Sequence, residues 1–230
     1  MAIILVGGNI AEIRGSEGGT TYSRNRFGAY SRSRVKPVNP NTSGQVAARS
    51  RFNYLAAYWK DTLTAAQRAG WELYASNTAW KNRLGQDVYL TGLNHFCRSN
   101  SLVLQVGGTL VVTPPTTFGL PDQEDDWTLA ATADDQKVTV TYSFDANVDD
   151  QYFAFWQGKP VSASRNFFAG PWRYLGVVAG DAATPPSSPA EFDAVFPVGA
   201  GQNCNVYCRR LDADGRVTQP FRVLAVVAAS

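Results

Sequence analysis

The sequence predicts a two-domain α+β protein with an extended basic N-terminal arm, a small helical domain and a C-terminal antiparallel β-sandwich. Apolar residues recur at helical spacing in the middle of the chain and alternate with polar residues in its C-terminal part. They follow neither period in an arginine-rich stretch near the N-terminus. We expect the arm at 1–43, the helical domain at 44–110, a linker at 111–126 and the β-sandwich at 127–230. With 230 residues and 44% hydrophobic content, the chain is long enough for both domains to have a core.

The arm contains a segment, residues 20–43 (TTYSRNRFGAYSRSRVKPVNPNTS), that has five cations and no acidic residue. Because it lacks the apolar period of a helix or a strand, we expect it to become ordered only on a partner. Arginine and aromatic residues are enriched at protein interfaces. The candidate intersubunit contacts are therefore the cations and aromatic residues of this segment: Tyr22, Arg24, Arg26, Phe27, Tyr30, Arg32, Arg34 and Lys36.

Three roles are open to this arm. It could be a disordered tail with no specific partner. Its arginines could contact phosphates while its aromatic rings stack on bases. It could also lie across neighbouring protein subunits, where arginines pair with carboxylates and aromatic side chains are buried as anchors. We favour the third role, because Pro37 and Pro40 interrupt the segment and no recognised nucleic-acid-binding module surrounds it.

Charge is distributed unevenly along the chain. Residues 1–107 contain 13 lysines and arginines against 5 acidic residues, whereas residues 108–230 contain 8 against 14. This asymmetry predicts head-to-tail contacts between copies or a basic face toward a polyanion. Two unrelated domains would also produce it by chance.

The first predicted helix spans residues 45–60. Ala48, Phe52, Leu55 and Trp59 recur there at intervals of four, three and four residues, which places them on one face of a helix.

The next two predicted helices begin at recognisable capping residues. Thr64 and Gln67 form a capping box before the helix at 65–75, and Thr91 caps the helix at 92–105.

Three shorter segments complete the N-terminal half. The apolar run Ala2–Val6 predicts a strand that adds to a sheet elsewhere in the chain or on a neighbour. Residues 76–86 are expected to form a loop, and residues 87–90 to be extended.

The C-terminal part has the pattern of a β-rich domain. The acidic run at 122–126 predicts a solvated turn, and residues 212–215 (DADG) predict a hairpin turn between the last two strands. After a first strand that begins at Trp127, the predicted strands are 137–144, 152–156, 172–178, 191–198, 203–211 and 216–227.

The last hairpin, NVYCRRLDADGRVTQPFRV, resembles a fibronectin type III or related immunoglobulin-like module. The resemblance implies a sandwich in which Cys204, Val206 and Cys208 face inward. The chain departs from the family at Cys204, where a corner tyrosine is usual, and at Tyr142, where the second strand often has tryptophan.

The N-terminal half resembles a family of tailed-phage and prophage proteins in three blocks, which occur in the same order as in that family. The blocks are FGAYSRSRVKPVNPNT, LTAAQRAGWELYA and NRLGQDVYLTGLNHF. The resemblance covers roughly residues 20–110. It implies a virion structural protein, most naturally a capsid decoration (cement) or minor structural subunit. Its partners would be other virion proteins and copies of itself, and it would be located in the virion after synthesis in the host cytoplasm. Nucleic acid is the less favoured partner.

No catalytic, metal or cofactor site is predicted, and we expect a protein that is not an enzyme. The single histidine, His95, has no further ligands at metal-binding spacing. The acidic run at 122–126 and the pair Asp149–Asp150 lack the ligand spacing of a calcium loop. We expect the three cysteines, Cys97, Cys204 and Cys208, to be buried free thiols, because their spacing does not make a disulfide framework. No segment approaches the ~20 apolar residues that cross a membrane, so no membrane partner is expected.

One alternative site lies in the β-domain. Phe167 and Phe168, beside Gly170–Pro171, are expected to be an exposed pair and could bind a glycan or a host surface protein. The alternative function is therefore a tail or host-surface-binding module.

Overall fold

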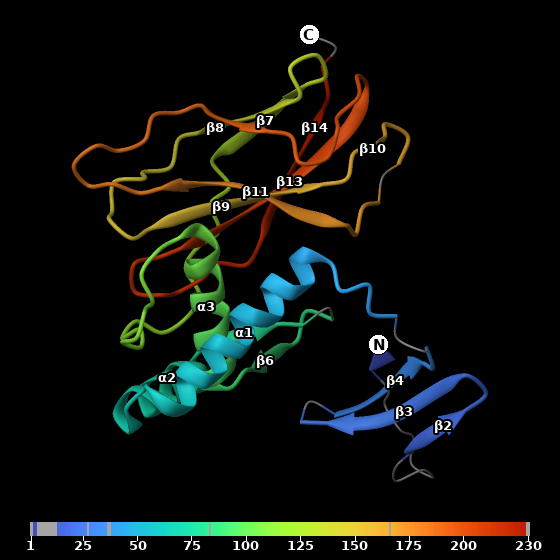
Figure 1. Cartoon of the computed structure of the whole chain (residues 1–230), viewed down its shortest axis with the longest axis vertical. Coiled ribbons are helices and arrows are strands. Elements are labelled where there is room, and N and C mark those ends of the chain that lie inside the picture. Colours follow the sequence, from blue (N-terminus) through green and yellow to red (C-terminus); the bar gives the residue numbers. More distant parts are fainter. Residues whose placement is uncertain are drawn as a thin grey trace. The chain divides into compact units, whose positions relative to one another are not determined.

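The chain forms two compact units, residues 1–48 and residues 49–230 (Figure 1). The computed structural model describes residues 2–3, 13–26, 28–35, 38–82, 84–165 and 167–228.

The N-terminal unit contains an antiparallel four-stranded sheet of order β1-β4-β3-β2. Its strands are β1 (Ala2–Ile3), β2 (Gly15–Glu17), β3 (Thr20–Asn25) and β4 (Gly28–Ser33). The expectation of an arm without secondary structure is therefore wrong, since most of the segment is a β-hairpin. Threonine, serine and tyrosine fit an extended strand without an apolar alternation, and the ladder of backbone hydrogen bonds satisfies the polar main chain. A φ of 120° at Gly28 allows the tight connection into β4.

The predicted N-terminal strand is present within this sheet. Ala2 pairs with Ser31 and Ile3 pairs with Tyr30 of the same chain, while residues 4–6 lie outside the described residues.

The three predicted helices are confirmed as α1 (Ser43–Asp61), α2 (Ala65–Asn77) and α3 (Gly92–Val106). The capping box is also present. The Thr64 hydroxyl accepts a hydrogen bond from the backbone N–H of Gln67 at 3.2 Å, and the Gln67 side chain accepts one from the Thr64 N–H at 2.9 Å.

One predicted loop contains a strand. Residues 76–86 were expected to be irregular, but β5 (Ala79–Lys81) pairs with β6 (Asp87–Tyr89) in a small antiparallel ribbon. Only three residues pair on each side, which is too short for a readable alternation in the sequence.

The helices enclose an aromatic core. Trp71 packs edge-to-face on Tyr74 and on Phe96, and Leu55 is buried beside them. Helix α3 begins against the backbone of α2, where a Cβ at Gly92 would lie 2.8 Å from the carbonyl carbon of Trp71. Only glycine permits this close approach.

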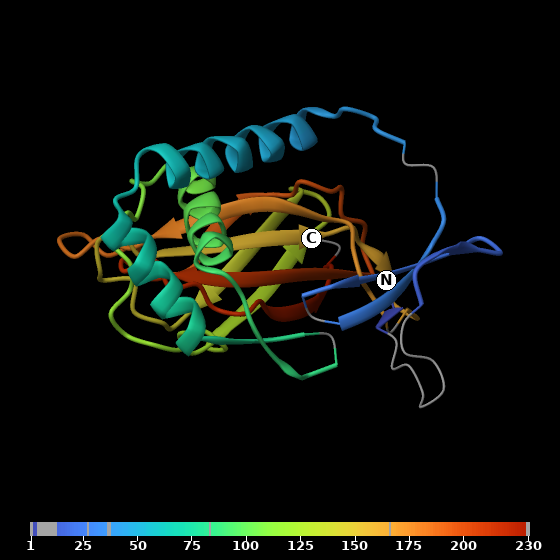
Figure 2. The same ribbon diagram turned by 90° about the horizontal axis from the view of Figure 1, so that it is seen from below.

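Two antiparallel sheets lie in the chain that follows α3 (Figures 1 and 2). One has the order β12-β8-β7. In the other, β9 lies between β11 and β13, with β14 and the short β10 also paired to β13. The strands are β7 (Trp127–Thr132), β8 (Lys137–Tyr142), β9 (Tyr152–Gly158), β10 (Val161–Ser162), β11 (Trp172–Ala179), β12 (Ala190–Asp193), β13 (Gln202–Leu211) and β14 (Phe221–Val226). The α+β class is thus observed.

Two predicted strands are shorter than expected. The strand predicted at 191–198 ends at Asp193, because the backbone N–H groups of Val195 and Phe196 bond to the buried Gln157 side chain instead of continuing the ladder. The strand predicted at 216–227 starts at Phe221, although Val217 still makes an isolated bridge to Leu211.

The acidic turn predicted at 122–126 is only partly solvated. Glu124 is half-buried and forms an ion pair with Arg210 of β13. The same arginine forms a second ion pair with the buried Asp212. The spacing of acidic residues could not show that a partner on a distant strand would cover one of them.

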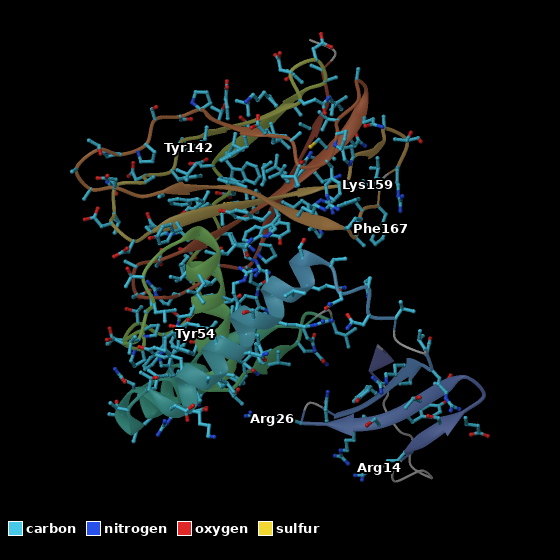
Figure 3. The ribbon with its side chains drawn as sticks, viewed as in Figure 1. Arg14, Arg26, Tyr54, Tyr142, Lys159 and Phe167 are labelled. Atoms are coloured by element: carbon cyan, nitrogen blue, oxygen red, sulfur yellow. The ribbon has the colours of Figure 1, made fainter. Side chains whose placement is uncertain are left out.

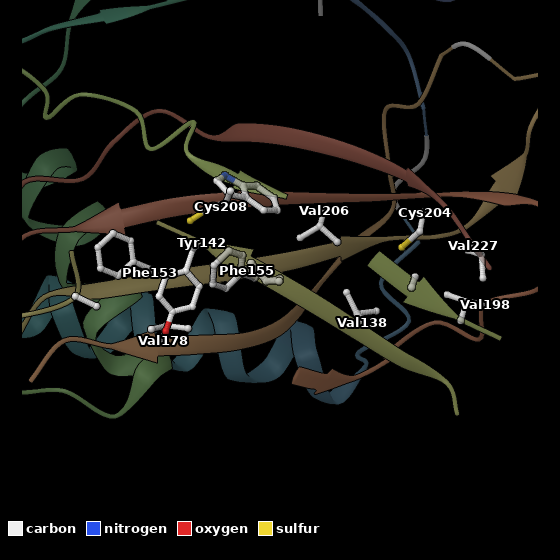
Figure 4. Close-up of a cluster of buried hydrophobic side chains, with 14 residues drawn as sticks. Val138, Tyr142, Phe153, Phe155, Val178, Val198, Cys204, Val206, Cys208 and Val227 are labelled. Atoms are coloured by element: carbon white, nitrogen blue, oxygen red, sulfur yellow. The ribbon is translucent and has the colours of Figure 1, made fainter. Parts of the chain in front are cut away.

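The inner faces of the two C-terminal sheets share one apolar core (Figure 4). Val138 and Val140 come from one sheet and Phe153 and Phe155 from the other, and all four are completely buried. The prediction that three alternate residues of β13 face inward is confirmed, since they are buried in this core: Cys204, Val206 and Cys208.

The outer face of the larger sheet is covered in part by helix α3. Leu102 and Val103 of α3 pack with Ala154 of β9 and Leu211 of β13 in a second apolar cluster. The helical and β-rich parts of residues 49–230 therefore share a core across the predicted linker, whereas their division into separate domains stays a prediction.

Candidate binding surfaces

The N-terminal sheet presents tyrosine and arginine side chains on both of its faces. Register pairs Tyr22 with Ser31 and Ser23 with Tyr30, so the side chains of Tyr22 and Tyr30 point to opposite sides. Arg24 shares the face of Tyr22, and Arg32 shares the face of Tyr30.

The other predicted contact residues of this segment are placed as follows. Arg26 lies at the turn between β3 and β4 (Figure 3). Arg34 follows β4, and its backbone N–H donates to the carbonyl of Gly19 at 2.6 Å. Phe27 and Lys36 lie outside the described residues. The structure thus brings the predicted residues into one small sheet but divides them between its two faces.

This sheet has no apolar core among its described residues. Every described side chain from residue 13 to residue 48 is exposed or half-buried, and none is buried. On the face of Arg32, a shallow concavity of about 330 Å³ is lined by Thr21, Arg32, Ser33, Arg34 and Val35. Among these described residues, strands β2 to β4 are therefore held by backbone pairing without the burial that normally stabilises a sheet.

The predicted phenylalanine pair is not an exposed pair. Phe167 is 72% exposed (Figure 3), but Phe168 is buried. The Phe168 ring packs against the backbone of Gly158, so close that a Cβ added at Gly158 would lie 2.3 Å from it. The ring also packs edge-to-face on Trp172, with ring centroids 4.9 Å apart. Because Gly158 of β9 has no side chain, the Phe168 ring has room to be buried there. The sequence alone could not predict this contact, because the two residues are ten positions apart.

An aromatic row crosses the outer face of the larger sheet. Register places Arg222 of β14, Tyr207 of β13, Trp156 of β9 and Tyr174 of β11 directly opposite one another in turn. The rings of Trp156 and Tyr207 stack with centroids 4.9 Å apart. Burial raises the pKa of the Tyr207 and Tyr174 hydroxyls, so both stay neutral. Sequence alternation predicts that these side chains point away from the core, but not that four strands align them.

The single histidine and the cysteines are buried. Burial and the charge of Arg98 lower the pKa of His95 to about 4, and its ring lies edge-on to Tyr74 at 5.1 Å. Burial raises the pKa of the Cys97 and Cys204 thiols to about 11. In the part of the chain that the structure describes, no three metal-ligating side chains come together, and no helix is long and apolar enough to span a bilayer.

Comparison with known proteins gives no relative that identifies the chain. No protein-family model matches it, and no curated protein matches it. A solved structure of a family 76 glycoside hydrolase from a bovine Bacteroides thetaiotaomicron strain is 16% identical over 47% of this chain and 21% of that chain. Its TM-score is 0.33, and a likeness of this size supports no conclusion on fold or activity.

Proposed function

We propose that the protein is a non-enzymatic structural subunit of a phage particle, as a capsid decoration or minor structural component. In this role its N-terminal sheet binds neighbouring virion proteins or other copies of itself. The proposal combines the three resembling sequence blocks with one structural observation, which is that no described residue from 13 to 48 is buried.

That observation supports a partner because strands without a buried face are marginal in water. Ordering a residue costs about 1–2 kcal/mol of backbone entropy, and apolar burial is the main term that offsets it. Tyr22 and Tyr30 offer apolar area, and Arg24 and Arg32 offer bidentate donors, on either face of the sheet. A protein surface laid on one or both faces would supply the missing burial.

A sandwich module of the immunoglobulin or fibronectin type III kind is the proposed identity of the C-terminal strands. Taken in chain order without β10, strands one, two and five (β7, β8 and β12) form one sheet. Strands three, six and seven (β9, β13 and β14) pair in the other. This is how the A, B, E and C, F, G strands divide in immunoglobulin-like sandwiches. Such modules are frequently displayed on surfaces, which fits a particle component.

The test uses the full chain in the phage that encodes it. Tyr22→Ala with Arg24→Ala removes one face of the contact, and Tyr30→Ala with Arg32→Ala removes the other. We expect at least one double variant to fold normally yet fall at least tenfold in copies per purified particle, measured by quantitative mass spectrometry. Arg165→Ala, an exposed site in the second unit, is the matched control. Normal incorporation of both double variants would refute binding through this sheet.

The exposed Phe167 favours one alternative, a host-surface or glycan-binding role for the β-rich part. In that case the intact protein would bind a glycan array and Phe167→Ala would abolish binding. Nucleic-acid binding by the arginines is the other alternative. It requires an affinity that falls steeply with salt, because phosphate contacts release counterions.

A further inference from the structure

A groove lies between the helices and the outer face of the larger sheet, within residues 49–230. Its volume is about 460 Å³. Helix α3 contributes most of one wall, Phe52 of α1 lies on the rim, and Trp156 and Arg209 come from β9 and β13. The groove therefore continues the aromatic row of the sheet. Its lining residues are Phe52, Leu90, Asn94, Cys97, Arg98, Ser101, Leu102, Gln105, Trp156, Arg209 and Val217.

Two arginines in this groove have buried nitrogens that lack a hydrogen-bond acceptor within the described chain. These atoms are Nη1 of Arg98 and Nε of Arg209. A third guanidinium, that of Arg51, approaches the same groove, where its Nη1 donates to the Gln105 side chain at 3.0 Å and to the carbonyl of Ser101 at 3.3 Å. Its Nε is also buried without a partner in the described part of the structure.

These cations contact aromatic rings in place of carboxylates. The Arg98 guanidinium lies 3.5 Å from the ring centre of Trp80, and that of Arg209 lies 5.8 Å from the ring centre of Tyr207. Every ion pair found among the described residues involves other cations: Lys81, Lys137, Arg210 and Arg216. Arg98 and Arg209 are both half-buried, and a partly desolvated cation without a counter-charge is costly. Two such cations near each other also repel.

The electrostatics agree with this geometry. Burial, and then the positive charge of Arg209, lower the pKa of Arg98 to about 10, and burial lowers the pKa of Arg209. Both side chains remain charged at neutral pH. An anion in the groove would contact the guanidinium nitrogens of Arg98 and Arg209 that line it, and its negative charge would reduce the repulsion between the two cations.

We propose that this groove binds an acidic side chain of a partner protein, with the carboxylate on Arg98 and Arg209 and neighbouring apolar side chains against Trp156 and Leu102. Guanidinium groups match a carboxylate in two parallel hydrogen bonds. The proposal does not depend on the virion role.

A polypeptide fits this groove better than a polyanion does. Two or three guanidinium groups neutralise only two or three charges, whereas nucleic-acid binding draws most of its affinity from many phosphate contacts. The protein as a whole has a formal charge of only +2, which gives little long-range attraction for a polyanion. The apolar lining is of no use to a phosphate but can bury the side chains that flank an aspartate or glutamate.

The test measures binding of the tripeptide acetyl-Leu-Asp-Leu-amide to the full-length protein by ¹H–¹⁵N NMR. The indole N–H signals of Trp80 and Trp156 are the reporters, because Trp80 contacts Arg98 and Trp156 lines the groove. We expect saturable shifts of both signals. The neutral isostere acetyl-Leu-Asn-Leu-amide should bind at least tenfold more weakly. Because this comparison uses the wild-type protein, it does not depend on any variant folding.

Variants locate the site. Arg98→Gln with Arg209→Gln should abolish the tripeptide shifts, whereas Arg173→Gln, an exposed arginine of β11 outside the groove, should leave them unchanged. Equal binding of the aspartate and asparagine tripeptides would overturn the proposal. It would also fail if succinate or inorganic phosphate bound as tightly as the tripeptide, because the apolar walls would then contribute nothing. Tighter binding of a ten-residue oligo-dT at the same two signals would assign the groove to nucleic acid instead.

Discussion

Two β-sheets of this protein differ in what stabilises them. The N-terminal sheet is built from polar strands such as TTYSRN, with no buried side chain among its described residues. The strand β9, YFAFWQG, has buried side chains on both faces, with Phe153 and Phe155 in the core between the sheets and Ala154 under helix α3. Backbone pairing alone can therefore define a strand, but apolar burial decides which sheet resists unfolding.

The same contrast separates two uses of arginine. In the N-terminal sheet, arginines lie on exposed or half-buried strands, where a new surface can reach them. In the groove, Arg98 lies on α3 and Arg209 on β13, and each has one guanidinium nitrogen buried without an acceptor in the described chain. The first arrangement leaves contacts adaptable, and the second fixes the ligand geometry in advance.

The largest effect is expected from the core of the larger unit. Phe155 is completely buried and contacts Trp127 and Phe192 from the opposite sheet. Phe155→Ala should lower the free energy of unfolding by about 3–5 kcal/mol, because it leaves a cavity between the sheets. Urea unfolding followed by tryptophan fluorescence measures this. The exposed Phe167→Ala should change the value by less than about 0.5 kcal/mol. Similar losses in both variants would mean that the sheets are not held by this core.

A pH effect of up to about 3 kcal/mol is expected from His95, since each unit of pKa difference corresponds to about 1.4 kcal/mol. Its pKa is about 4 in the folded protein against 6.5 in an unfolded chain, because burial and the charge of Arg98 disfavour protonation. Between these values the unfolded state binds more protons. Stability should therefore fall as the pH drops from about 6.5 toward 4.

The check is urea unfolding at several pH values for the wild type and His95→Gln. The wild type should lose stability more steeply than the variant across this window, because only the wild type has the titrating imidazole. Parallel pH profiles would show that His95 is protonated as easily in the folded protein as in the unfolded chain.

An intermediate effect is expected at the start of α2. Thr64→Ala removes both the hydroxyl that accepts from the Gln67 N–H and the reciprocal capping arrangement. The free energy of unfolding should fall by about 1 kcal/mol. Thr62→Ala, an exposed threonine two residues earlier, is the control and should be close to neutral. Equal values for the two variants would mean that the cap does not contribute to the stability of the larger unit.

Much of the larger unit could be predicted from its sequence because its patterns are periodic. The spacing of Phe52, Leu55 and Trp59 defined α1, and Thr64 and Thr91 marked helix starts. The resemblance of the last hairpin to an immunoglobulin-like module implied that Cys204 and Cys208 lie on the inner face of β13. Each of these signals lies within a few residues, so no knowledge of distant contacts was required.

The features that sequence missed depend on contacts between distant residues. The polar hairpin of β3 and β4 has no apolar alternation, so only its backbone pairing reveals it. The alternation of β13 predicts that Arg209 points outward, and it is half-buried because the helical part covers the outer face of the sheet in part. Phe168 is buried because Gly158, ten residues earlier on β9, leaves room for its ring.

The smallest effect on global stability is expected in the N-terminal sheet, and it is the sharpest test of the comparison between the two sheets. Tyr22→Ala with Tyr30→Ala should change the global free energy of unfolding by less than about 0.5 kcal/mol, because neither ring is buried. Hydrogen exchange should show why. In the isolated protein, amides of β3 and β4 should exchange far faster than those of β9, since strands whose described side chains are all exposed or half-buried open locally at little cost.

Binding should reduce this difference in exchange rate between the two sheets, because a partner surface would bury the tyrosines and raise the free-energy cost of opening β3 and β4. Amide protection in β3 and β4 should therefore increase when the protein is incorporated into its assembly, while protection in β9 stays the same. Protection of β3 and β4 as strong as that of β9 in the isolated protein would contradict a partner-dependent sheet. It would show that backbone pairing stabilises these polar strands without burial.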